Sequence, residues 1–119
     1  MSVRAAVYSL LSGLEADVFP FNAQQETTDP YVVFTMRMEP TRTQDGVTVT
    51  DINLALEIYA STLSDCISLA DTLYAGMEGT SGTYATETLM ISNWVGEADY
   101  YIDDLQKYGI TQEYQLRFA

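Results

Sequence analysis

The sequence contains no histidine and a single cysteine, Cys66, among its 119 residues. Nucleophilic triads and most zinc sites need these residue types, so both kinds of catalytic centre are disfavoured. One cysteine also excludes an internal disulfide. Its place on a predicted apolar helix stripe indicates a small buried side chain rather than a reactive thiol.

Basic residues are scarce: there are five, against 17 acidic residues, which gives a formal net charge of −12. Arg4, Arg37, Arg42, Lys107 and Arg117 are scattered along the chain and do not suggest a basic cleft. An acidic surface repels nucleic acid and anionic membranes and selects basic partners. No apolar run approaches the roughly 18 residues of a membrane span, and the N-terminus lacks the apolar segment of a signal peptide. We therefore expect no membrane association and a reducing cytoplasm as the place of synthesis.

Residues 48–60 form the clearest predicted strand, because apolar and polar side chains alternate strictly over ten of them. The apolar set is Ile52, Leu54, Leu56, Ile58 and Ala60. The opposite set is mostly polar, which predicts an antiparallel sheet with one solvated face. Residues 62–77 are predicted to form a helix with Thr62 as its N-cap and with Gly76 and Gly79 at its end. The expected apolar stripe of this helix is Leu63, Cys66, Ile67, Ala70, Leu73, Tyr74 and Met77.

The rest of the chain predicts one further helix and three further strands. The helix is expected over residues 2–16, and a connector over 17–30 follows it. The strands are expected over 31–38, 85–95 and 108–118. In the second of these, Leu89, Ile91 and Val95 are placed on one face, and in the last strand Gln112 interrupts an apolar face.

Two polar links, residues 40–47 and 96–107, are expected to project from the body. Asp45 and Gly46 form a turn signal that predicts a hairpin between residues 31–38 and 48–60. The chain is therefore predicted to be one α+β domain over residues 1–119. It has two layers, a mainly antiparallel four-stranded sheet and two helices.

Carboxylates are the one enzyme-like feature. Asp99, Asp103 and Asp104 could supply hard oxygen ligands to calcium or magnesium, although their spacing is not that of an EF-hand loop. A solvated acidic turn is the favoured interpretation. General acid–base catalysis would need a desolvated cleft, which nothing in the sequence indicates. We therefore predict no enzyme, no cofactor and no metal site.

Tyrosine is abundant, with nine residues, most of them on or beside predicted strands. A tyrosine joins a large apolar area to a polar tip, which suits surfaces that are exposed before assembly. Tyr59 falls on the polar face of the central strand. It marks either a contact with another chain or an ordinary tyrosine at the sheet margin, and both interpretations stay open.

Four segments, in this order, resemble the tail completion (tail terminator) proteins of long-tailed bacteriophages, which are head–tail joining proteins. They are Asp-Pro-Tyr-Val-Val-Phe (29–34), Leu-Ala-Leu-Glu-Ile-Tyr-Ala (54–60), Ser-Leu-Ala-Asp-Thr-Leu (68–73) and the final residues 108–118. The N-terminal helix fits as well, so the resemblance spans nearly the whole chain. The polar residues 22–29 do not match the family pattern.

The resemblance implies a structural virion protein with no catalytic residues. Such proteins form a ring, commonly hexameric, at the head-proximal end of the tail tube, and they are assembled in the host bacterial cytoplasm. The ring contacts the tail tube protein and the head-completion or connector protein, and DNA passes through its lumen without specific binding.

The predicted helix covers one face of the sheet, so the resemblance assigns subunit contacts to the other face and to the two links. These residues are Thr41, Arg42, Asp45, Gly46, Asn53, Glu57, Tyr59, Tyr100 and Tyr101. An acidic lumen or loop is assigned to Glu97, Asp99, Asp103 and Asp104. Two alternatives remain: a head-completion or connector adaptor, which would lie one layer toward the capsid, and an acidic cytoplasmic module that binds a basic protein.

Overall fold

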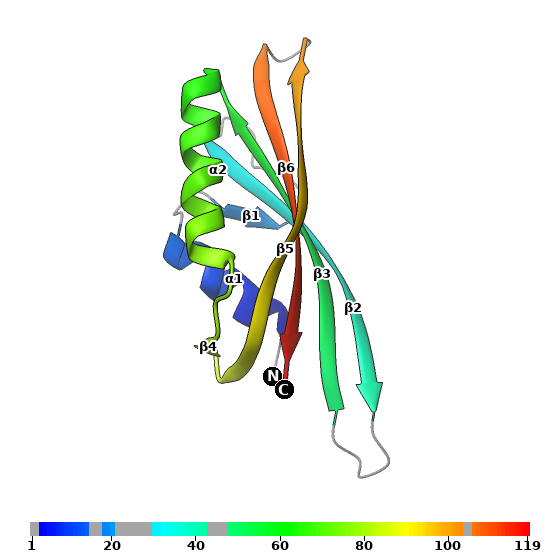
Figure 1. Cartoon of the computed structure of the whole chain (residues 1–119). Helices are drawn as coiled ribbons and strands as arrows, with labels where there is room; N and C mark the ends of the chain where they lie inside the picture. The colour runs from blue at the N-terminus through cyan, green and yellow to red at the C-terminus, as the bar shows by residue number, and fades with distance from the viewer. Residues whose placement is uncertain (1–2, 15–17, 21–29, 43–47, 104–105) are drawn as a thin grey trace.

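The chain folds into a twisted sheet with two helices on one of its faces (Figure 1). The computed structural model describes residues 3–14, 18–20, 30–42, 48–103 and 106–119. The helices are α1 (Val3–Leu14) and α2 (Leu63–Met77). The strands are β1 (Val18–Pro20), β2 (Tyr31–Arg42), β3 (Thr48–Ala60), β4 (Gly82–Tyr84), β5 (Glu87–Ile102) and β6 (Lys107–Phe118).

The strand order of the sheet is β1-β2-β3-β6-β5-β4. Five strands pair antiparallel, and β1 adds a short parallel pairing with β2. The α+β class and the mainly antiparallel sheet agree with the sequence prediction. The predicted number of four strands is wrong, because β1 and β4 extend the sheet at its two edges. Each is three residues long, too short to show the alternation by which a strand is recognised.

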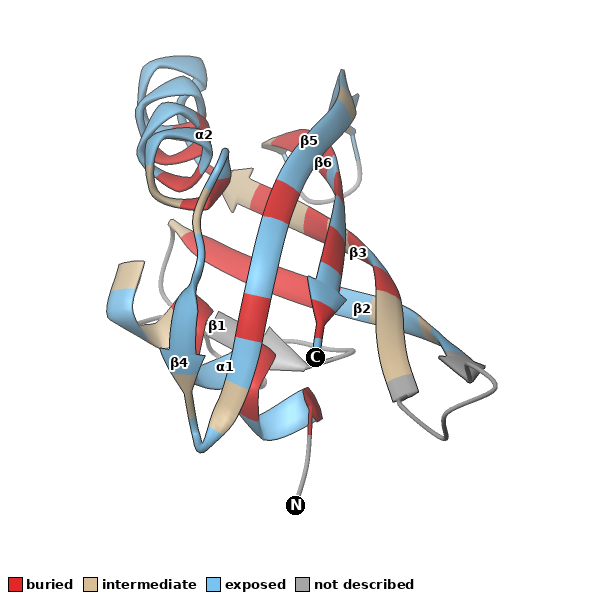
Figure 2. Ribbon diagram, turned by 60° about the horizontal axis from the view of Figure 1, so that its bottom comes forward, coloured by how far each residue is buried: buried red, intermediate tan, exposed pale blue. Residues whose placement is uncertain are grey.

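One face of the sheet packs against the helices, and the pattern of β3 explains why. Ile52, Leu54, Leu56 and Ile58 are at most 1% exposed, whereas their polar neighbours in sequence point to the other side. Helix α2 begins where predicted, since the Asp65 N–H donates to Thr62 Oγ1 at 3.2 Å. Figure 2 shows buried residues, in red, along the central strands of the sheet and on both helices.

The apolar stripe of α2 is narrower than predicted. Leu63, Ile67 and Tyr74 are between 44% and 46% exposed, so their assignment to the stripe is wrong. The stripe follows the residues that directly meet the sheet, because a helix of 3.6 residues per turn turns the flanking positions toward solvent. The buried residues of α2 are Cys66, Leu69, Ala70, Leu73 and Met77.

Gln112, the polar interruption in β6, is buried between the sheet and α2. Its side-chain Nε2 donates to the Ala70 carbonyl at 2.9 Å and to Glu97 Oε1 at 3.1 Å. Its Oε1 accepts from the Tyr114 hydroxyl at 3.0 Å. The amide is therefore hydrogen-bonded at both ends, which makes its burial tolerable and ties β6 to a helix and to β5.

Strand β5 differs most from the prediction. It continues to Ile102, so most of the expected link over residues 96–107 is strand. Two bulges interrupt its pairing with β6 and leave Met90 and Val95 without a partner residue. The first bulge places Leu89 opposite Phe118 but Ile91 opposite Arg117, so Leu89 and Ile91 lie on opposite faces, contrary to the period-two assignment.

The hairpin of β2 and β3 is confirmed and is longer than expected, since β2 continues through Pro40 to Arg42. The predicted turn residues Asp45 and Gly46 lie outside the described residues, as does most of the connector over 17–30. This hairpin extends beyond the helices at one end of the sheet, and the β5–β6 hairpin does so at the other (Figure 1). The molecule is accordingly elongated, with extents of 52 × 25 × 21 Å.

Candidate interaction surface

The face of the sheet opposite the helices is open to solvent over most of its area, and we call it the open face. It is built from the alternate residues of β2, β3, β6 and β5 that point away from α2. Three predicted contact residues, Asn53, Glu57 and Tyr59, lie together on the β3 part of this face, where period-two alternation places them.

A group of tyrosines stands at one end of the open face. The ring centroid of Tyr59 lies 5.2 Å from that of Tyr31 and 6.4 Å from that of Tyr100, and Lys107 Nζ lies 4.9 Å from the Tyr31 centroid. The Tyr59 hydroxyl donates to Glu57 Oε2 at 2.8 Å. Burial, followed by Tyr100 and Glu57, raises the pKa of Tyr59 above its ordinary value. Tyr59 is therefore held in place by its neighbours and remains a neutral hydrogen-bonding group at physiological pH.

Gly109 explains how this group of tyrosines is packed. It lies opposite both Tyr59 and Tyr100 in the sheet. A Cβ atom at this position would approach the Tyr100 ring to 2.5 Å. The missing side chain thus leaves room for the ring. A glycine inside a predicted strand is the one sequence signal that marks such a close approach.

The structure separates two contact residues that the sequence analysis groups together. Tyr101 points to the helix side of β5, where its ring packs 5.0 Å from that of Tyr108, while Tyr100 belongs to the open face. Thr41 and Arg42 lie at the end of β2, far along the sheet from the tyrosines. Asp45 and Gly46 are outside the described residues.

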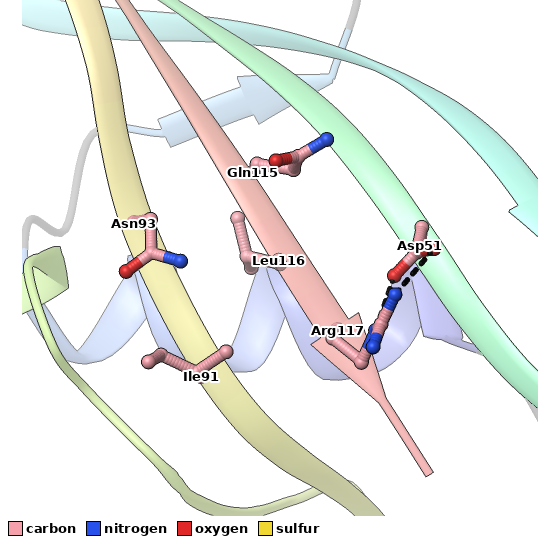
Figure 3. Close-up of a pocket in the computed structure, with 6 residues that line it drawn as sticks. All are labelled: Asp51, Ile91, Asn93, Gln115, Leu116 and Arg117. Atoms are coloured by element: carbon pink, nitrogen blue, oxygen red, sulfur yellow. Dashed lines mark hydrogen bonds and ion pairs between the residues drawn. The ribbon is translucent and has the colours of Figure 1, made fainter.

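Shallow depressions follow β6 along the open face. One of them, of about 250 Å³, is lined by Asp51, Ile91, Asn93, Gln115, Leu116 and Arg117 (Figure 3). Within it Arg117 donates to Asp51 through Nε at 2.7 Å and through Nη2 at 3.1 Å. This paired hydrogen bond lowers the pKa of Asp51 below its ordinary value. The arrangement joins β3 to β6 and leaves neither group free to act on a substrate.

Two of the four predicted acidic residues, Glu97 and Asp99, lie on a strand and not in the expected link. Glu97 and Asp99 are exposed on the helix side of β5, and Glu97 accepts from Gln112. Asp103 follows at the end of the strand, and Asp104 is outside the described residues. Among the described residues, no group of three or more histidine, cysteine or acidic side chains could hold a metal ion.

The apolar surface of β5 is a feature that sequence analysis misses. Val95 and Met90 are 59% and 50% exposed, more than any other large apolar side chain in the described part of the chain. Both are the unpaired residues of the two bulges. Gly96, an isolated glycine within a strand, is the signal that could have located the second bulge. Trp94 beside it packs edge-on against Tyr74 of α2, with ring centroids 5.8 Å apart.

The architecture defines a class: a small α+β domain in which two helices cover one face of a mainly antiparallel sheet. Within the described residues no helix is long and apolar enough to cross a membrane. No family model matches the chain, and no curated protein matches it.

Among solved structures, the chain is similar to a chain of the virion of the native gene transfer agent (GTA) particle. The TM-score is 0.77 at 12% sequence identity, and the match covers 98% of this chain and 94% of the other. The two chains therefore share their fold over nearly the whole length.

Proposed function

We propose that this chain is a non-enzymatic structural protein of a phage-like virion. In this proposal it forms a ring, of six copies, on the head-proximal end of the tail tube. The observation that carries the proposal is the fold shared end to end with a chain of a gene transfer agent virion. The ordered sequence segments that resemble tail completion proteins support it independently.

The proposed ring uses the open face and the hairpins for contacts between neighbouring copies. Asn53, Glu57 and Tyr59 present a mixed polar and aromatic surface, and the tyrosines around Tyr59 are already held in position. A surface whose side chains are ordered before binding loses less entropy on association. The ends of the two hairpins, which extend beyond the helices, reach the tail tube protein on one side and the head connector on the other.

The net negative charge of the chain is compatible with a lumen through which DNA passes without binding. With a net charge of −12, a ring of six copies carries a large negative charge. Glu97, Asp99 and Asp103 line the lumen in this proposal. Repulsion between these carboxylates and phosphates lets DNA pass without being held, because affinity for DNA depends on cationic neutralisation of the backbone.

Two measurements test the proposal: the mass of the protein in solution, and its binding to the end of tail tubes. Sedimentation over a range of concentrations should show a species of about 80 kDa, six times the 13.3 kDa chain. Electron microscopy of tubes assembled from the tail tube protein of the same virion should show a ring at one end. A chain that is monomeric at every concentration and also leaves the tubes uncapped contradicts the proposal. So does retention of DNA at physiological salt.

A head-completion or connector adaptor is the second candidate. The same structural likeness supports it equally, since the similar chain comes from the virion of a gene transfer agent particle. This candidate predicts binding to isolated heads and no effect on tail tubes. An acidic module for a basic partner would instead stay monomeric and bind neither assembly.

A further inference from the structure

The outer edge of β5 is hydrogen-bonded to other segments before Val95 but not from Val95 onward, among the described residues. Before this residue the edge is occupied: β4 pairs with Glu87–Leu89, the Gly79 N–H donates to the Ser92 carbonyl at 2.8 Å, and the Trp94 N–H donates to Glu78. From residue 95 to 102 no hydrogen bond from another described segment reaches this edge. An uncovered strand edge of eight residues is a ready template for pairing with another chain.

The opposite edge of the same sheet has a matching stretch. β1 pairs with β2 only from Val32 to Phe34, so residues 35–42 of β2 have no neighbouring strand among the described elements. This stretch is also eight residues long, about 27 Å at the rise of an antiparallel strand. It ends in the hairpin that extends beyond the helices (Figure 1).

We propose that residues 95–102 of β5 in one copy pair, antiparallel, with residues 35–42 of β2 in a second copy. Within the sheet, β2 and β5 run in opposite directions, because three antiparallel pairings separate them. These directions make β5 of one copy and β2 of the next an antiparallel pair. Tyr100 lies level with Tyr31 across the sheet, so a contact that sets Tyr100 opposite Arg37 offsets the next copy by six residues, about 20 Å, along the strands. Repetition of such a head-to-tail contact closes a ring when the strands are inclined to the ring axis, as the staggered strands of a barrel are. This inference rests on the proposed ring and moves the main contact between copies from the open face to the two sheet edges.

Charge selects this pairing over the alternative of two β5 edges. The free stretch of β5 contains Glu97 and Asp99 and no basic residue, whereas that of β2 contains Arg37 and Arg42 with one acid, Glu39. Two β5 edges side by side would bring four carboxylates together, and like charges opposite one another destabilise a sheet. The head-to-tail contact instead brings two of the five basic residues of the chain to an acidic edge.

The register follows from full overlap of the two stretches. It sets Val95 opposite Arg42 and Ala98 opposite Glu39. It also sets Tyr100 opposite Arg37, whose side chain is 78% exposed and can stack on the tyrosine ring. In this register the helix side and the open face of the two sheets each continue across the contact, so every copy keeps its helices on the same side.

A cysteine pair tests the contact directly. Residues directly opposite in an antiparallel pair have Cα atoms about 4.5–5.5 Å apart, within the range that a disulfide spans. Ala98→Cys and Glu39→Cys, combined in one chain, should give a covalent ladder from dimer to hexamer under copper phenanthroline. If the register is shifted by two residues in either direction, Ala98→Cys should instead cross-link to Arg37→Cys or to Thr41→Cys. Native Cys66 does not compete, because it is fully buried and burial raises the pKa of its thiol to about 11.

Single variants and one matched pair are the controls. Ala98→Cys alone and Glu39→Cys alone should remain uncross-linked. Asn93→Cys with Glu39→Cys should give no ladder, because Asn93 is exposed on β5 but lies where Glu78 and Gly79 occupy the edge. A dimer from either single variant, or an equal ladder from the matched pair, overturns the proposal. The reactions are run on the full-length chain both free and on tail tubes.

The outcomes separate this inference from the proposed function. Capped tubes without a ladder in any of the three registers mean that the ring uses another surface, so the pairing is wrong while the function stands. A ladder from a protein that never caps tubes means that the edge contact exists and the tail function is wrong. A chain that neither forms a ladder nor caps tubes contradicts both.

Discussion

The two faces of the sheet are built from the same strands but differ in what covers them. On β3, Leu54 and Leu56 are almost fully buried under α2, while Asn53 and Glu57, on either side of them in the sequence, remain accessible. The covered face is complete within one chain. The open face has its side chains ordered, as the group around Tyr59 shows, yet no other described element lies over it. We propose from this difference that stability resides on one face, and recognition on the other face and at the edges.

The largest effect is expected from the covered face. Leu56→Ala should lower the free energy of unfolding by about 2–5 kcal/mol, because it opens a cavity among buried side chains of the sheet and α2. Urea denaturation followed by circular dichroism measures the loss. Glu57→Ala, one residue away on the open face, is the matched control and should cost far less. Equal losses of unfolding free energy in the two variants would contradict the inference that the covered face contributes most of the stability.

Gln112 offers a sharper test of the same face. Gln112→Met keeps the volume but leaves the Ala70 carbonyl and the Tyr114 hydroxyl without their partner, at a cost of about 1–3 kcal/mol. Tyr114→Phe removes only one of these bonds and should cost less. The double variant should fall short of the sum, because the two residues share a hydrogen bond. Strict additivity in the measured free energies would show that the network is not coupled.

The covered face is largely predictable from sequence, and the reason is the regularity of its pattern. Residues 48–60 alternate without interruption, and Thr62 caps the helix that follows, so the predicted bounds of both elements agree with the structure to within a residue. The long β5 strand is predictable only in part. Its two bulges break the alternation at Met90 and Val95, and its second half is acidic and aromatic, a composition that also suits a loop.

Contacts between distant strands are the part that sequence does not supply. That Tyr31, Tyr59 and Tyr100 meet depends on the order β2-β3-β6-β5 and on the gap left by Gly109. No local pattern encodes that order. The assignment of Tyr100 and Tyr101 to one surface follows their proximity in sequence, whereas adjacent residues of a strand point to opposite faces.

An intermediate effect is expected on the open face at Gly109. Gly109→Ala places a methyl group against the Tyr100 ring and should cost about 1 kcal/mol, the lower end for overpacking, because the ring is partly exposed and can move. The same variant should weaken assembly of the proposed six-copy ring more than it weakens folding of the single chain. Sedimentation and urea denaturation measure the two quantities. Gly109→Ala combined with Tyr100→Ala should fold as well as Tyr100→Ala alone, and a persistent loss would show that the tyrosine ring is not what the methyl group meets.

The smallest effect is expected at the other end of the open face, in the pair of Asp51 and Arg117. The pair lies at the surface, with 52% of the Arg117 side chain and 26% of the Asp51 side chain exposed, so Asp51→Asn should reduce stability less than any variant above, and 1 M salt should remove most of the difference. The folded-state pKa of Asp51 is depressed, so its contribution is present above the ordinary value of 3.8 and is lost as the pH falls through the lower, folded-state pKa. The wild type and Asp51→Asn should therefore converge in stability toward acid. A gap that widens on acidification would contradict the pairing, whereas convergence would confirm that the pair contributes only while Asp51 is ionised.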